Sequence, residues 1–206
     1  MTVLKATKNN IIATAKIVKR GGLVVYPTET VYGLGCNPLD SQAVKRVIDV
    51  KGERNKPLSV LAASIEDVER VAFISQNGKR LAAKFWPGPL TLVFPKKFSL
   101  PDIVTFNHDS VGLRIPDSDV ALQLISLCGG LLIGSSANVT GEKPPRSVQE
   151  ISGKLKGIVD VVLDGGSTVQ GTPSTVADLT LDKPRILRDG PISLKAILDA
   201  LAFCDQ

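Results

Sequence analysis

The chain has 206 residues, of which 43% are hydrophobic, 22% are charged and only 4% are aromatic. This length suits one domain, or at most two small ones, and can bury a core without metal or disulfide cross-links. Three scattered cysteines indicate a reducing compartment rather than a disulfide framework, and the single histidine, His108, excludes multi-histidine metal sites. The net charge of +5 permits anionic partners such as nucleotides, but solubility alone explains it equally well.

Membrane and export signals are the next features to test. No apolar stretch reaches the ~20 residues that span a bilayer. Residues 1–10 contain no apolar core of the kind that a signal peptide needs. We therefore expect a cytoplasmic protein without a membrane partner.

Apolar periodicity and turn residues predict an alternation of helices and strands along the chain. In chain order, we expect a helix around 11–18, a strand over 23–27, a polar connection over 28–40, a helix from 40 or 41 to about 50, a strand over 57–63, a helix capped by Ser64, a helix over 75–85, strands over 91–94 and 111–116, a helix over 119–128, a strand over 131–136, a helix over 148–155, strands over 158–164, 174–179 and 185–188, and a helix over 194–203.

The predicted strands and helices do not alternate strictly, and several strands are neighbours in sequence. This pattern favours an α/β fold with a twisted mixed sheet flanked by helices over an all-parallel, doubly wound sheet. We see no repeat or linker, so we expect residues 1–206 to form a single domain.

Common nucleotide-binding motifs are absent, but polar residues cluster where predicted strands end. The chain has no GxxxxGK[ST] motif, and Gly33-Leu34-Gly35 does not continue as a dinucleotide fingerprint. Residues 27–35 place hydroxyls beside glycines directly after a buried strand, which suits either a ligand site or an ordinary turn. Residues 51–56 carry three cations, which suits either a clamp on phosphates or a solvated helix end.

Two further polar features stand out. Residues 135–141 (SSANVTG) follow an apolar run and could hold phosphate oxygens or a base edge, whereas a serine-hydrolase site lacks a histidine base near them. Arg114 lies within an apolar strand, where a buried guanidinium needs either a protein carboxylate or an anionic ligand. Ser174 and Arg188 lie at the ends of two other predicted strands.

Together these segments resemble the YrdC-type L-threonylcarbamoyladenylate synthase family in its short, single-domain form. The resemblance extends from about residue 8 to residue 200 and rests on seven segments in the family's order: 21–35, 51–61, 86–93, 111–116, 135–141, 174–179 and 185–190. It implies a YrdC-like fold, and a reaction in which L-threonine, bicarbonate and ATP give threonylcarbamoyl-adenylate and pyrophosphate. It also implies Mg²⁺ with the triphosphate, and a downstream complex that transfers the threonylcarbamoyl group to tRNA beside the anticodon.

The resemblance also implies roles for individual residues. The implied contacts with threonine or its carbamate are Thr28, Arg114 and Ser174. The implied ATP-binding residues are Lys51, Lys56, Ser136, Asn138 and Arg188. Lys51 and Arg54 are the implied catalytic residues, because the reaction needs alignment and positive charge around the triphosphate rather than a covalent intermediate.

One departure from the family pattern concerns the loop after Lys51. The family places an arginine two positions after this lysine, where this chain has Glu53, and Arg54 follows one position later. We expect a shift of the loop to bring Arg54 or Lys56 to the phosphates, and reduced activity is the alternative. Two rival functions remain open at this point: a module that binds double-stranded RNA or tRNA without catalysis, and an enzyme for another carbamoyl-type substrate.

Overall fold

The computed structural model describes residues 2–52, 56–181 and 183–202, and confirms the α/β class with mixed strand directions. The strands of this described part form two hydrogen-bonded sheets, where a single sheet was expected. The first sheet has the order β1 (Thr2–Lys5), β9 (Val161–Asp164), β2 (Val24–Tyr26), β3 (Gly33–Gly35) and β8 (Ser135–Ser136). The second has the order β11 (Arg185–Arg188), β10 (Thr175–Asp178), β5 (Leu90–Pro95), β6 (Ser110–Arg114), β4 (Val60–Ala62) and β7 (Leu131–Ile133).

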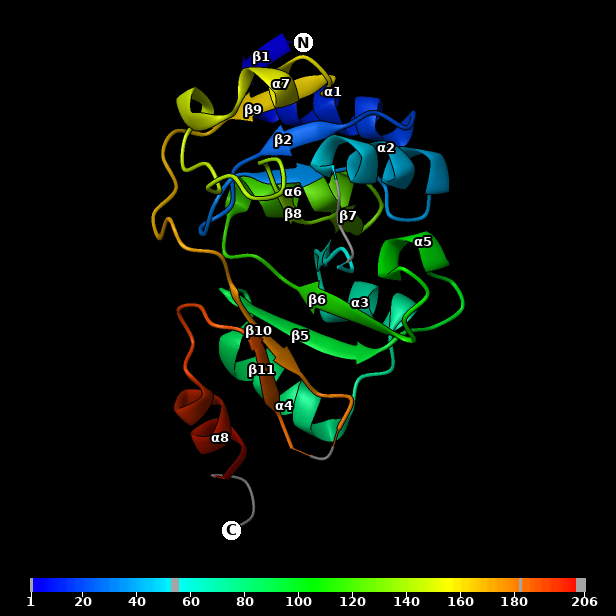
Figure 1. Cartoon of the computed structure of the whole chain (residues 1–206), viewed down its shortest axis with the longest axis vertical. Helices are drawn as coiled ribbons and strands as arrows, with labels where there is room; N and C mark the ends of the chain where they lie inside the picture. The colour runs from blue at the N-terminus through cyan, green and yellow to red at the C-terminus, as the bar shows by residue number, and fades with distance from the viewer. Residues whose placement is uncertain (1, 53–55, 182, 203–206) are drawn as a thin grey trace.

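Helices flank both sheets, and Figure 1 shows β1, β9 and β2 in one half of the molecule and β5, β10 and β11 in the other. The helices are α1 (Lys8–Lys19), α2 (Ser41–Lys51), α3 (Ile65–Val71), α4 (Gln76–Phe85), α5 (Asp102–Thr105), α6 (Asp119–Leu127), α7 (Gly153–Lys156) and α8 (Leu194–Ala202). In the residues described, none of them combines the length and the apolar character that crossing a bilayer requires.

Side-chain caps fix the helix starts that the sequence predicts. The Asp40 carboxylate accepts hydrogen bonds from the backbone N–H groups of Gln42 and Ala43, at 3.0 and 3.1 Å, at the start of α2. The Ser64 hydroxyl accepts one from the N–H of Asp67 at 3.3 Å and so begins α3. Each cap satisfies helix donors that would otherwise lack a partner.

The division into two sheets occurs at Gly134, inside the segment predicted as one strand over 131–136. Ile133 pairs with Val60 of β4, whereas Ser135 pairs with Leu34 of β3, so the chain passes from one sheet to the other between them. A Cβ at Gly134 would lie 2.6 Å from the Leu61 side chain, so only glycine permits this close passage.

Other elements differ from the prediction for local reasons. The helix expected over 148–155 is a 3₁₀ turn (Val148–Glu150) followed by α7, because Ser152 caps a new helix and interrupts the first. Strand β3 lies within the expected connection over 28–40, where Gly33 leaves room for the Tyr26 ring of the adjacent strand. Strand β1 and helix α5 were also not predicted.

One cluster of buried side chains joins the two sheets. It contains Val25 and Leu34 from the first sheet together with Leu92 and Leu113 from the second. Because these aliphatic side chains pack in a shared core, the two sheets hold a fixed relation to each other. The polar ends of their strands meet beside this core.

Candidate active site

A pocket lies between the two sheets and is lined mainly by polar side chains. Its lining consists of Tyr26, Thr28, Thr30, Val31, Gly33, Ser59, Leu61, Thr91, Arg114, Gly134, Ser135, Ser136, Pro173, Ser174 and Arg188. These residues come from strands of both sheets and from the connections that follow β2, precede β10 and join β7 to β8. Segments far apart in the sequence therefore meet at one concave site.

The turn after β2 is held by the hydroxyl of Thr28. This hydroxyl donates to the carbonyl of Val31 at 2.7 Å and lies 2.9 Å from the hydroxyl of Thr30. Nη1 of Arg114 donates to the Thr30 hydroxyl at 3.1 Å. A continuous chain of contacts therefore links Thr28, Thr30 and the guanidinium on β6.

Arg114 also has a buried carboxylate beside it. Its Nη1 lies 3.4 Å from Oε1 of Glu29, and both side chains are buried. Burial lowers the pKa of Arg114, and the charge of Glu29 opposes that effect. The guanidinium is thus kept cationic at one wall of the pocket, as a site for a carboxylate or carbamate requires.

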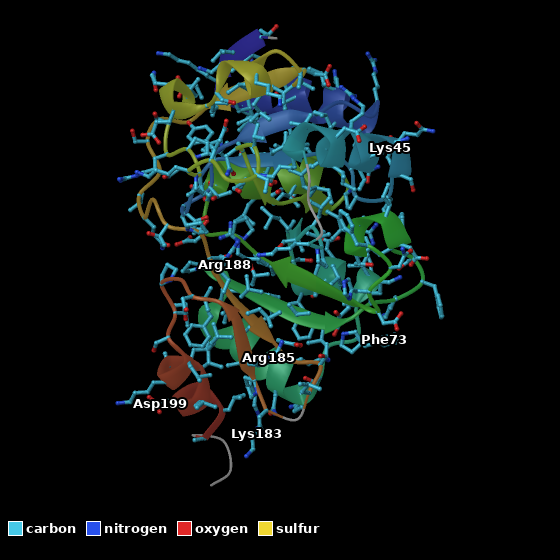
Figure 2. The ribbon with its side chains drawn as sticks, viewed as in Figure 1. Lys45, Phe73, Lys183, Arg185, Arg188 and Asp199 are labelled. Carbon is cyan, nitrogen blue, oxygen red and sulfur yellow. The ribbon has the colours of Figure 1, made fainter. Side chains whose placement is uncertain are left out.

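Ser174 organises a second part of the pocket lining, next to the start of β5. The Ser174 hydroxyl lies 2.8 Å from that of Thr91 and accepts a hydrogen bond from Nη2 of Arg188 at 3.0 Å. Nε of Arg188 donates to the Ser174 carbonyl at 2.9 Å. Figure 2 shows Arg188 near the junction of the two halves of the molecule, whereas Arg185 of the same strand lies farther from it. The second cation of the pocket is therefore oriented by two hydrogen bonds.

Lys51 lies beside this pocket and contacts the loop that follows β8. Its ammonium donates to the carbonyls of Ser136 and Asn138, at 2.7 and 2.5 Å, and to Oδ1 of Asn138 at 3.2 Å. The Asn138 amide donates in turn to the carbonyl of Glu142 at 2.6 Å. Lys51 is buried, so its charge fixes the shape of the loop that carries Ser136.

The sequence-predicted site residues thus have four different outcomes. The pocket lining includes Thr28, Arg114, Ser136, Ser174 and Arg188. Lys51 and Asn138 hold the loop beside it, and the exposed Lys56 is not among the lining residues identified in the described chain. Arg54 lies outside the described residues, so its role stays a prediction.

Several residues of the pocket were not predicted individually. Thr30, and Glu29 next to the lining, belong to the polar segment 27–35, but nothing in their local sequence distinguishes them from Thr28. Tyr26 and Thr91 lie within predicted strands, where alternation does not reveal which residues face a pocket. The Tyr26 hydroxyl donates to the Ile133 carbonyl at 2.9 Å, and burial raises its pKa well above the ordinary value, so it remains protonated.

The thiol of Cys36 and the side chains that could bind a metal are the remaining groups near this site. Burial raises the pKa of Cys36 to about 12, so its thiol is neutral near pH 7, as expected of a packing residue. Among the residues that the structure describes, no group of three or more histidine, cysteine, aspartate or glutamate side chains could hold a metal ion. The donors that line the pocket are hydroxyls and guanidinium groups, which suit anionic and hydroxylated ligands.

Comparisons with known proteins agree with this fold. The model of the Sua5/YciO/YrdC family, described as "Telomere recombination", matches residues 16–190. A threonylcarbamoyl-AMP synthase of Pyrococcus abyssi is 42% identical over 185 residues, which cover 89% of this chain and 54% of the relative. A putative threonylcarbamoyl-AMP synthase of Mycobacterium tuberculosis is 38% identical over 193 residues, which cover 93% of this chain and 88% of that protein.

A solved structure gives the same result. The crystal structure of P. abyssi Sua5 complexed with L-threonine superposes with a TM-score of 0.94 at 38% identity, covering 98% of this chain and 61% of that one. This chain therefore spans a little over half the length of the Pyrococcus protein and most of the mycobacterial one. The matched segment includes every described residue of the pocket. The chain belongs to the Sua5/YciO/YrdC family.

Proposed function

We propose that this protein is a threonylcarbamoyl-AMP synthase, which forms threonylcarbamoyl-AMP and pyrophosphate from L-threonine, bicarbonate and ATP. The observation that carries the proposal is the convergence of Thr28, Arg114, Ser174 and Arg188 on one pocket. Relatives over most of the chain carry this name, and a structural relative was solved with L-threonine. The expected extent of the domain, residues 1–206, is part of the same proposal.

The reaction consists of two bond-forming steps. The amine of threonine attacks the carbon of bicarbonate or CO₂, and loss of water or of a proton gives the N-carboxylate. An oxygen of that carboxylate attacks the α-phosphorus of ATP, and the bond from phosphorus to the pyrophosphate oxygen breaks. Neither step needs a covalent bond to the enzyme, so the protein acts by alignment and by stabilising negative charge.

The pocket residues suit these two steps. Arg114 pairs with the carboxylate or carbamate of the amino acid, and the hydroxyls of Thr28 and Ser174 complete that subsite. ATP binds to Arg188 and to the loop that carries Ser136 and Asn138. The guanidinium of Arg188 is held by hydrogen bonds of 2.9 and 3.0 Å to Ser174. Lys51 and Lys56 add positive charge near the triphosphate, and Arg54 remains the proposed replacement for the family arginine.

Mg²⁺ enters this proposal only as the counterion of ATP. The described residues offer no carboxylate cage, so phosphate oxygens and water would supply most of its ligands. No step of the reaction proposed here depends on a protein-held metal. The product would pass, in the cytoplasm, to the complex that modifies tRNA. RNA binding without catalysis is not favoured, because relatives are named as synthases and a neighbour binds threonine.

The test is release of pyrophosphate by the purified protein supplied with ATP, Mg²⁺, bicarbonate and L-threonine. We expect release that requires both threonine and bicarbonate, with serine as a poor replacement, and a product with the mass of threonylcarbamoyl-AMP. Binding of ATP without threonine-dependent release would contradict the proposal. Salt-sensitive RNA binding that ATP does not affect would then favour the RNA-binding alternative.

A further inference from the structure

Glu29 and Arg114 form a buried pair of opposite charges at the pocket. Oε1 of Glu29 lies 3.4 Å from Nη1 of Arg114, and the two side chains are only 7% and 6% exposed. Within the described part of the chain, neither carboxylate oxygen of Glu29 has a hydrogen-bond partner. The negative charge is therefore balanced by the guanidinium rather than by backbone donors or solvent.

The two charges occupy different positions relative to the pocket. Arg114 lines it, as do Thr28 and Thr30 on either side of Glu29, but Glu29 itself is not a lining residue. The carboxylate therefore does not line the space for a ligand, whereas its ion-pair partner Arg114 does. The guanidinium of Arg114 also donates a hydrogen bond to the hydroxyl of Thr30, another residue that lines the pocket. Glu29 can act on a ligand through charge without touching it.

Charge balance then distinguishes ligands of the same shape. An anion beside Arg114 adds a second negative charge next to Glu29, in a place where water does not screen it. A zwitterionic amino acid offers the same carboxylate but carries no net charge, because the positive charge of its ammonium group offsets the negative charge of its carboxylate. Arg188 also lines the pocket, but its side chain lies at an exposed strand end, where solvent weakens its field.

We propose that Glu29 is a specificity-determining residue: by neutralising Arg114, it makes the amino-acid subsite select net-neutral amino acids over anions of the same shape. This inference rests on the proposed function, which assigns the carboxylate of threonine to Arg114. The role differs from a purely structural one, because it predicts a change in ligand selectivity rather than only in stability. Glu29 disfavours a ligand that carries the carboxylate without a neighbouring ammonium group.

The experiment compares Glu29→Gln with the wild-type protein by isothermal titration calorimetry without ATP. The two ligands are L-threonine and 2,3-dihydroxybutanoate of matching configuration, in which a hydroxyl replaces the amine and the net charge is −1. We expect the wild type to bind the anion at least about tenfold more weakly, and Glu29→Gln to reduce this ratio by about tenfold by tightening anion binding. An unchanged ratio in Glu29→Gln would overturn the inference.

Controls separate this inference from the proposed function and from global effects. Glu66→Gln removes the same charge from an exposed site, and its ratio must equal that of the wild type. Failure of the wild type to bind threonine would overturn the proposed function, whereas threonine binding with an unchanged ratio overturns only the role of Glu29. If Glu29→Gln does not fold, the wild-type titrations decide: anion binding as tight as threonine binding overturns the role, and weaker anion binding supports it.

Discussion

The ammonium of Lys51 lies 2.7 Å from the backbone carbonyl of Ser136, across 85 residues of sequence. Helix α2 ends at Lys51, so this contact ties the end of a helix to the loop that follows β8. A buried ammonium has three donors, and the carbonyls and side chain of the 136–138 loop accept from it. The ammonium of Lys51 therefore supports this loop, and with it one side of the pocket, together with the hydrogen bonds of Asn138.

Replacing Lys51 with Met tests this role. The variant keeps a similar apolar stem but leaves buried carbonyls without their donor, which costs about 2–4 kcal/mol of unfolding free energy. We expect loss of pyrophosphate release together with a lower midpoint in urea unfolding. Lys45→Met is the matched control, because Lys45 is exposed on the same helix (Figure 2) and its loss changes stability by less than about 0.5 kcal/mol. Wild-type stability in Lys51→Met would contradict this account.

Thr30 provides a second test, at the centre of the contacts between Thr28 and Arg114. Thr30→Val removes the hydroxyl that accepts from Nη1 of Arg114 at 3.1 Å but keeps the side-chain shape. We expect KM for threonine to rise about tenfold, the equivalent of one hydrogen bond to a charged group, with a smaller change in KM for ATP. Thr30→Ser restores the hydroxyl and should recover most of the affinity. Equal effects of both variants would indicate a packing defect instead.

Much of the local structure could be predicted because its causes are local. The caps at Asp40 and Ser64 and the apolar face of α2 are readable from a few adjacent residues. The division of the strands into two sheets could not be predicted in this way. It involves a close contact between Gly134 and Leu61, which lie far apart in the sequence. The sequence pattern shows which residues are buried. It does not show as readily which strands are neighbours in a sheet.

The same limit applies to the site. Thr28, Arg114, Ser174 and Arg188 were grouped through family resemblance, and they do line one pocket. The pairing of Glu29 with Arg114 requires strands β2 and β6 to be placed in space, and no local pattern encodes it. Lys51 belongs to a cluster of cations that usually indicates a solvated surface, yet its side chain is buried.

Alkaline pH should destabilise the protein through its buried acids. Burial raises the pKa of Cys36 and Cys128 from 9.0 to about 12, and that of Tyr32 from 10.0 to about 12. At a pH between the unfolded and the folded pKa, each thiol or phenol has lost its proton in the unfolded chain but keeps it in the folded chain. Stability is therefore intact below about pH 9 and falls as the pH rises toward 12. Urea unfolding from pH 7 to pH 11 measures this slope, and Cys36→Ala with Cys128→Ala should reduce it. An unchanged slope would refute the assignment.

Arg188 tests whether orientation, rather than charge alone, matters at the part of the pocket next to Ser174. Arg188→Lys keeps the charge but cannot donate to both the carbonyl and the hydroxyl of Ser174, which the guanidinium contacts at 2.9 and 3.0 Å. We expect kcat/KM for ATP to fall about tenfold or more, while unfolding stability stays within about 0.5 kcal/mol, because the residue is exposed. Arg185→Lys on the same strand is the matched control, since it lies away from the pocket lining, and its kinetics should equal those of the wild type. Wild-type kinetics in Arg188→Lys would mean that a point charge suffices at this position, and Ser174 would then lose its proposed role in orienting Arg188.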